Sequence, residues 1–259
     1  MSARVQSRRA NQIDPLAVDS NTHSFSKLSR AARRVGVLAP MSLELAPLVR
    51  ELSLVETEPN CWHGNLGLIE VVATMTTIGM QPARHATQAM VERDVGHVMI
   101  VGIAGAVSNS AAIGSVVYPD RVVARSTGEV FRPMVLHDEH VAGAISCGDE
   151  LITDASALDV LEKAGVVALD MESAAVASVC ERAGVGWSVW RALSDHAGGG
   201  LIDSELFAMT NADGSADPQA LQRALADATT TARLVKLGHD ANLAAAHAAA
   251  AAIAAITRL

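Results

Sequence analysis

The sequence predicts an α/β fold: a three-layer αβα sandwich around a central mixed, mostly parallel sheet. Apolar, strand-like runs alternate with helical stretches along most of the chain, which is typical of this class. The runs are almost continuously apolar, as expected of strands that are covered on both faces. With 259 residues, half of them hydrophobic, the chain holds enough apolar material for one large domain.

The elements follow from local patterns taken in order. Residues 35–39 form an apolar strand, and residues 44–52 carry a helical stripe of Leu45, Leu48, Val49 and Leu52. Further strands are expected at 66–74, 97–103, 115–124, 142–146, 166–169 and 187–193, and further helices at 82–93, 151–163, 172–183 and 218–237. Residues 242–256 are rich in alanine and predict a helix on the surface or against a partner.

The expected organisation has three parts. Residues 1–33 are polar, basic and aperiodic, which predicts a disordered basic tail, with a transit peptide as the alternative. Residues 34–237 form one folded domain, and residues 238–259 form an Ala-rich C-terminal helix.

Composition argues against several functions. The net charge is −8 and only 3% of residues are aromatic, so neither the basic face nor the stacking platform of a nucleic-acid binder is evident. No apolar run is long enough to span a membrane. Cys61, Cys147 and Cys180 are widely spaced and odd in number, which fits a reducing cytoplasm better than a disulfide framework.

Polar residues follow three predicted strands, where open α/β sheets bind ligands. These are Glu44, Glu172 and Asp195, and a glycine turn at residues 101–107 follows a further strand. The glycines of that turn would let backbone N–H groups approach a ligand closely. Taken singly, each feature has a purely structural explanation, since an acid at a helix start stabilises the first turn and a loop acid binds its own backbone.

Together and in this order, the motifs resemble those of the nucleoside phosphorylase superfamily, and most closely the methylthioadenosine/S-adenosylhomocysteine nucleosidases. The segments that carry the resemblance are residues 35–45, 101–107, 146–152, 169–175 and 191–195. The last two, Leu-Asp-Met-Glu-Ser-Ala-Ala and Arg-Ala-Leu-Ser-Asp, are the specific ones. The resemblance implies that residues 34–237 are a catalytic domain, that no cofactor is needed and that the protein is a homodimer.

The resemblance also implies a role for each site residue. Asp195 protonates the departing purine with Ser194 orienting it, and Glu44 deprotonates the attacking water. Glu172 binds the ribose hydroxyls and Met171 packs against the sugar. Ala104 and Gly105 in the glycine turn, with Leu151 and Ile152 in the purine-recognition segment, complete the expected binding site.

The chemistry agrees with these roles, because breaking an N-glycosidic bond builds positive charge on the sugar and negative charge on the base. General acid and base steps of this kind contribute about 10²–10⁴-fold each. Asp195 must be protonated when it acts, so its pKa should be raised by burial or by neighbouring charge. Arg191 lies four residues before Asp195 and would lower that pKa if both shared a strand face.

Water is favoured over phosphate as the nucleophile. The phosphorolytic relatives carry arginines after the first strand and before the glycine turn, and a hydroxyl residue within it, whereas this chain has residues 39–42 (Ala-Pro-Met-Ser), Val101 and Ile103 there. A phosphate dianion needs such charged donors. The alternatives are a purine nucleoside phosphorylase and a catalytically silent nucleoside-binding protein.

Two departures leave the substrate open. Leu151 stands where the nucleosidases carry a phenylalanine, and residues 124–142 are shorter than the segment that helps form their 5′ pocket and dimer contact. Another purine nucleoside, including a futalosine-like one, is therefore allowed. His137-Asp138-Glu139-His140 is interpreted as a solvated loop and not as a metal site, since it lacks the spacing of a zinc-protease helix motif.

Overall fold

The computed structural model describes residues 33–259, so the expected basic tail lies, apart from Arg33, outside the described residues. Within this range eleven strands form one mixed sheet. The strands are β1 (Arg34–Ala39), β2 (Val55–Glu58), β3 (Cys61–Leu66), β4 (Ile69–Met75), β5 (His97–Ala106), β6 (Val116–Val117), β7 (Pro119–Ala124), β8 (Val130–Phe131), β9 (Gly143–Cys147), β10 (Val166–Asp170) and β11 (Gly186–His196). The helices are α2 (Ser42–Glu51), α3 (Met80–Glu92), α4 (Ala155–Lys163), α5 (Ser173–Ala183), α6 (Ser204–Ala208), α7 (Pro218–Ala224) and α8 (Ala228–Ile256).

The long strands at the centre of the sheet run parallel to one another. The order is β2-β3-β4-β1-β5-β10-β9-β7-β8, and β11 pairs with both β5 and β6. Parallel pairs join β1 to β4 and β5, β5 to β11, and β9 to β7 and β10. Antiparallel pairs lie at the edges and where β10 meets the end of β5. The expected α/β fold with a mixed sheet is confirmed.

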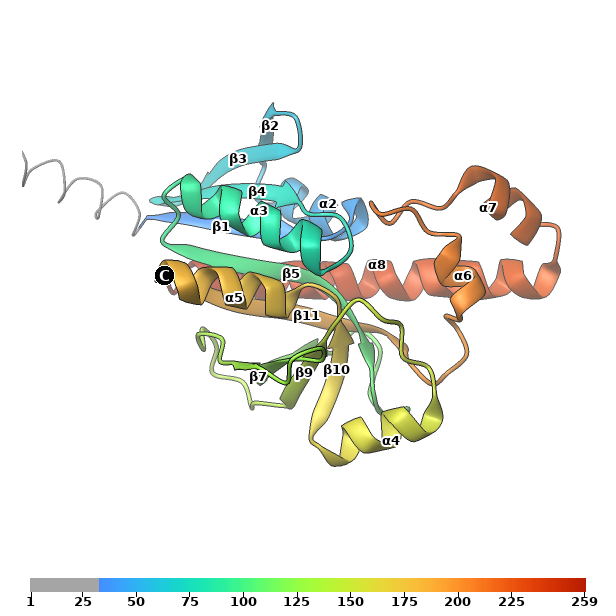
Figure 1. The fold of residues 1–259 in the computed structure, drawn as a ribbon. Helices are drawn as coiled ribbons and strands as arrows, with labels where there is room; N and C mark the ends of the chain where they lie inside the picture. The colour runs from blue at the N-terminus through green and yellow to red at the C-terminus, as the bar shows by residue number, and fades with distance from the viewer. Residues whose placement is uncertain (1–32) are drawn as a thin grey trace, which may run out of the picture.

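Helices cover both faces of this sheet and form a large core on each. On one face α3 and α5 pack on the strands through residues such as Met90 and Val176. On the other face α2 and α8 pack through residues such as Leu48 and Ala248. Figure 1 shows α3 and α5 in front of the long strands and α8 behind them. In the described part of the chain, no helix is long and apolar enough to cross a bilayer.

Several predicted boundaries were wrong for local reasons. The strand expected at 66–74 is interrupted by a turn at Gly67, whose φ is 61°, so β3 and β4 form a hairpin. The helix expected at 151–163 begins only at Ala155, because Asp154 caps it by accepting the N–H of Ala157 at 2.9 Å.

The C-terminal part also differs from the expectation. The helix expected at 218–237 is two helices, since Asp227 caps a new helix by accepting the N–H of Thr230. Helix α8 then runs unbroken past residues 237 and 238, where the sequence suggested a boundary. Its alanine face does not lie on the surface but is buried against the protein's own sheet, because small side chains let the helix approach closely.

Because helix α8 approaches the sheet so closely, the stability of the protein should depend on the volume of the side chains buried between them. Ala248 is fully buried in the core shared by α8, β5 and β11, so Ala248→Leu should lower the free energy of unfolding by about 1–3 kcal/mol through overpacking. The matched change Ala250→Leu, on the exposed face of the same helix, should alter it by less than about 0.5 kcal/mol. Urea denaturation measures both, and equal effects would contradict the packing described here.

Candidate active site

A single cavity of about 390 Å³ opens at the carboxyl ends of β1 and β10, beside the second halves of β5 and β11. This is a common size for a small-molecule site. All nine site residues suggested by the sequence line it: Glu44, Ala104, Gly105, Leu151, Ile152, Met171, Glu172, Ser194 and Asp195. The structure therefore brings together residues from five separate parts of the chain.

Glu44 lies in the first turn of α2 and is 1% exposed. One carboxylate oxygen accepts the backbone N–H of Met41 at 2.8 Å, as in a capping box, and the other accepts the N–H of Ile103 in β5 at 2.7 Å. Glu44 thus caps its helix and also fastens it to the sheet. Burial is the main cause that raises the pKa of this carboxyl to about 8.

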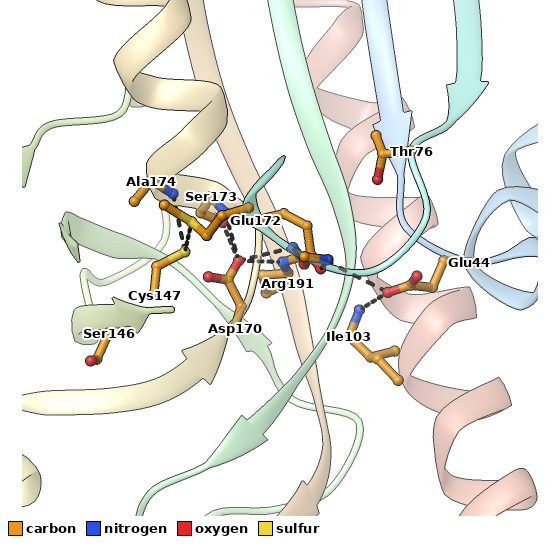
Figure 2. A network of polar contacts seen from close by, with 12 residues as sticks. Glu44, Thr76, Ile103, Ser146, Cys147, Asp170, Glu172, Ser173, Ala174 and Arg191 are labelled. Carbon is orange, nitrogen blue, oxygen red and sulfur yellow. Dashed lines mark hydrogen bonds and ion pairs between the residues drawn. The ribbon is translucent and has the colours of Figure 1, made fainter. Parts of the chain in front are cut away.

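Arg191 in β11 is fully buried and lies between three acidic side chains (Figure 2). Its Nη2 is 2.7 Å from an oxygen of Glu172, its Nε donates to Asp170 at 3.0 Å, and its Nη1 lies 3.6 Å from Glu44. Burial opposes the charged guanidinium, but the carboxylates of Asp170, Glu172 and Glu44 outweigh it and raise the pKa of Arg191. The arginine therefore stays charged inside the protein.

Gly102 in the glycine turn makes room for the charged side chains beside it. A Cβ on Gly102 would lie 2.0 Å from an oxygen of Glu44 and 2.6 Å from Nη1 of Arg191, so only glycine leaves room for these two groups. The N–H of Ile103 in the same turn donates to Glu44. Gly105 lies nearer the other end of the site, where its Cβ position is 3.6 Å from Asp195.

Glu172 precedes α5 but makes no side-chain bond to cap that helix. One of its oxygens accepts the N–H of Gly79 at 2.8 Å, and the other pairs with Arg191. Asp170 holds the start of α5 instead, by accepting the N–H of Ser173 at 3.2 Å. Burial is the largest cause that raises the pKa of Glu172. The helix-capping explanation therefore does not account for Glu172.

Asp195 is 7% exposed and accepts a hydrogen bond from the hydroxyl of Ser194 at 2.6 Å. Leu193 pairs with Ala104 and Asp195 with Gly105, so Ser194 is an extra residue that forms a β-bulge in β11. The bulge reverses the alternation of side chains, so Asp195 does not share the face of Arg191.

This separation decides the charge environment of Asp195. Burial is the largest cause that raises its pKa above the ordinary 3.8, and it outweighs the opposite effect of the Ser194 hydrogen bond. Arg191 is not among the groups that shift this pKa. The two ends of the cavity thus differ: one end holds a buried cation with its carboxylates, and the other holds an acid whose pKa is raised by burial.

Leu151 and Ile152 lie in an extended segment before α4. Arg125 holds this segment by donating to the carbonyl oxygens of Gly148 and Glu150, both at 2.8 Å. The role of Arg125 could not be found from the sequence, since no local pattern links it to a segment more than twenty residues away. The sequence relates Arg191 only to its neighbour Asp195, although a lone arginine in an apolar strand is itself a signal.

The segment after β11 also lines the cavity, and the sequence patterns did not indicate this role. The N–H of Ile78 donates to the carbonyl of Ala212 at 2.7 Å, which ties this segment to the turn before α3. Gly214 lies against Met41, since a Cβ there would be 2.4 Å from that side chain. These contacts give the loop between α6 and α7 defined partners.

In the His137–His140 segment His137 packs against aromatic rings, whereas Asp138, Glu139 and His140 are exposed. The ring of His137 lies 4.3 Å from that of Tyr118 and 6.2 Å from that of Trp190, measured between centroids. Within residues 33–259 no three His, Cys, Asp or Glu side chains gather as metal ligands.

Comparison with known proteins agrees with this architecture. A nucleosidase described as acting on 5′-methylthioadenosine and S-adenosylhomocysteine, from Thermotoga maritima, is 29% identical over 166 residues, which cover 56% of this chain and 76% of the relative. The S-adenosylhomocysteine nucleosidase of Streptococcus pyogenes, solved with 5-methylthiotubericidin, superposes with a TM-score of 0.67 at 20% identity, covering 88% of this chain and 98% of the other. Futalosine hydrolase of Helicobacter pylori gives a TM-score of 0.65 at 17% identity, covering 88% and 99%.

At these identities the two solved structures establish the fold alone. The family assignment comes from the sequence profile described as the phosphorylase superfamily, which matches residues 34–142 and 134–235. These matched stretches include every acidic residue of the cavity and most of the described chain. The resemblance found in the motifs is thereby confirmed, and the chain belongs to the phosphorylase superfamily.

Proposed function

We propose that this protein hydrolyses the N-glycosidic bond of a purine nucleoside, in the manner of the methylthioadenosine/S-adenosylhomocysteine nucleosidases. The observation that carries the proposal is the convergence of Glu44, Glu172 and Asp195 on one cavity. The nucleosidase among the sequence relatives supports it, as do the nucleosidase structures that share the fold. The reaction needs no cofactor in this proposal.

Asp195 acts as the general acid. A purine leaves most easily when it is protonated as the glycosidic bond breaks, and an acid with a raised pKa keeps its proton for that step. The hydroxyl of Ser194, 2.6 Å from one oxygen of Asp195, fixes the orientation of the carboxyl group. Leu151 and Ile152 form the apolar wall against which the base packs.

Glu44 and Glu172 act at the sugar. Glu44 in its ionised form takes a proton from water, which then attacks the anomeric carbon, and its charge favours the cationic ribosyl group. An acid and a base on either side of the attacking water resemble the pair of carboxyl groups in inverting glycosidases. Glu172 accepts hydrogen bonds from the ribose hydroxyls, while Met171 contacts the sugar. Arg191 touches none of the reacting atoms and positions both glutamates.

Phosphorolysis is the alternative, because the superfamily is named for it. A phosphate dianion needs cationic donors near the anomeric carbon. Among the described residues that line the cavity, Arg125 is the one Lys or Arg, and it is bound to backbone carbonyls in the segment that carries Leu151. At the sugar end a phosphate dianion would be repelled by the carboxylate of Glu44. Water is therefore the favoured nucleophile.

The proposal also covers the cellular location, the ligand and the oligomeric state of the enzyme. Three buried free cysteines suit a reducing compartment, which supports a cytoplasmic location. The partner is a small-molecule purine nucleoside, with neither nucleic acid nor membrane involved. The homodimer rests on the family resemblance, and sedimentation analysis measures it directly.

Purified protein should release free purine base from a nucleoside in buffer without phosphate. A panel of adenosine, inosine, 5′-methylthioadenosine and futalosine, with base detected by chromatography, serves as the assay. Added phosphate should not increase the rate, and free ribose, not ribose 1-phosphate, should be the second product. Strict dependence on phosphate would establish the phosphorylase instead.

Asp195→Asn should lower kcat by about 10²–10⁴-fold, because asparagine cannot donate the proton that the purine needs. Asp159→Asn is the matched control: Asp159 is exposed on α4 and paired with Lys163, and its change should leave kcat within about twofold. Circular dichroism checks that both variants are folded. If folded wild type and Asp195→Asn are equally inert across the panel, the protein is a silent nucleoside binder.

The pH dependence follows from the two shifted carboxyl groups. Catalysis needs Glu44 ionised, a form that increases as pH rises through about 8, and Asp195 protonated, a form that is lost as pH rises through its own pKa. The wild-type kcat/KM should therefore be bell-shaped. In Asp195→Asn the limb due to Asp195 is lost, so the residual kcat/KM should rise with the ionisation of Glu44 between pH 6 and 9; a flat or falling profile would refute the assignment of Glu44.

A further inference from the structure

The first turn of helix α3 has no capping side chain of its own. The helix begins after Gly79, which has no side chain, its first turn contains no acidic residue, and Pro82 has no N–H to donate. The free N–H groups at the start of a helix carry partial positive charge, so they attract carboxylates. The groups that bind them here come from distant parts of the chain.

Two carboxylates bind consecutive N–H groups at this turn. The N–H of Gly79 donates to Glu172 at 2.8 Å, and the N–H of Met80 donates to Asp149 at 2.7 Å. The φ of Gly79 is 112°, and a Cβ there would lie 3.2 Å from the bonded oxygen of Asp149, so glycine suits this position. The thiol of Cys147 lies 3.5 Å from Sδ of Met80 and adds a third contact. The two acids are thus held one residue apart on the same backbone.

Asp149 belongs to the segment on which the purine base is proposed to pack. We call residues 148–152 the base segment. Arg125 donates to the carbonyl oxygens of Gly148 and Glu150 and so fixes the shape of this segment. Asp149 is exposed and does not line the cavity. Its carboxylate joins the base segment to α3, so it can act on a ligand only through other groups.

We propose that Asp149 is a positioning residue that holds the base segment at a fixed distance from Glu172. This inference rests on the proposed function, because a nucleoside spans both groups, with its base on the base segment and its ribose hydroxyls at Glu172. A misplacement of about 1 Å between binding groups can cost about 10²-fold in rate. Without Asp149, Arg125 would still shape the base segment, but the distance of the segment from Glu172 would vary.

The binding of two kinds of ligand tests this role without any need for catalysis. Formycin A and formycin B are C-nucleosides that resemble adenosine and inosine, and their carbon–carbon glycosidic bond is not hydrolysed. Adenine and hypoxanthine are the matching free bases. A C-nucleoside should contact both the base segment and Glu172, whereas a free base should contact the base segment alone. Calorimetry gives the Kd values for the pair whose C-nucleoside the wild type binds more tightly.

Asp149→Ala should weaken binding of the C-nucleoside about fivefold and binding of the free base less than about twofold. The factor of about five corresponds to the typical cost of a lost helix cap, because a smaller fraction of the variant has the spacing that the nucleoside needs. Asp149→Asn keeps an oxygen that can accept the N–H of Met80, so its affinity for the C-nucleoside should lie within about twofold of the wild type.

Asp159→Ala is the matched control. Asp159 is an exposed aspartate on α4 that pairs with Lys163, far from the start of α3 in the chain, and its removal should leave both Kd values unchanged. Circular dichroism checks that each variant is folded. Because Asp149 is exposed, its substitutions should not disturb the core.

The outcomes separate this inference from the proposed function. Equal weakening of C-nucleoside and free base in Asp149→Ala, or no weakening of either, overturns the positioning role. An asparagine variant as weak as the alanine variant also overturns it, because the accepting oxygen would then have no effect. The expected pattern in a protein that releases no base from any nucleoside overturns the hydrolysis and supports the positioning role. Failure of the wild type to bind either C-nucleoside overturns both.

Discussion

The buried ion cluster around Arg191 is the interaction on which the rest of the site depends. One guanidinium with no exposure to solvent is shared by Glu44 from α2 and by Asp170 and Glu172 at the end of β10. Removing one partner of such a cluster leaves an uncompensated buried charge, which costs about 3–5 kcal/mol. The cluster therefore fixes α2, β10 and β11 against one another, and it holds Glu44 and Glu172 at one end of the cavity.

The same strand keeps the guanidinium of Arg191 apart from Asp195. The bulge at Ser194 turns Asp195 away from the face of Arg191, and burial raises the pKa of the Asp195 carboxyl. A regular strand would have put cation and acid on one face. One extra residue in β11 thus separates the ion cluster from Asp195, a division that suits the proton donor that we propose for cleavage of an N-glycosidic bond.

Helix α8 links the core of the protein to the cavity. Its C-terminal half packs alanines against β5 and β11 and completes the core on that face of the sheet. Its N-terminal half extends past the sheet and lines the cavity together with α6 and α7. Because the helix is continuous, the core holds this wall of the cavity in place, and no helix boundary falls at residues 237 and 238.

The sequence by itself determined the class of fold, the family and the acids Glu44, Glu172 and Asp195. These features are local: hydrophobic periodicity reports burial, and a motif keeps its residues together in the chain. Only the tertiary structure decided what those acids contact. The pairing of Arg191 with Glu44, the hold of Arg125 on the segment of Leu151, and the meeting of α6, α7 and α8 over the cavity all join residues far apart in sequence. Such contacts depend on strand register, a bulge and helix packing, which no local pattern encodes.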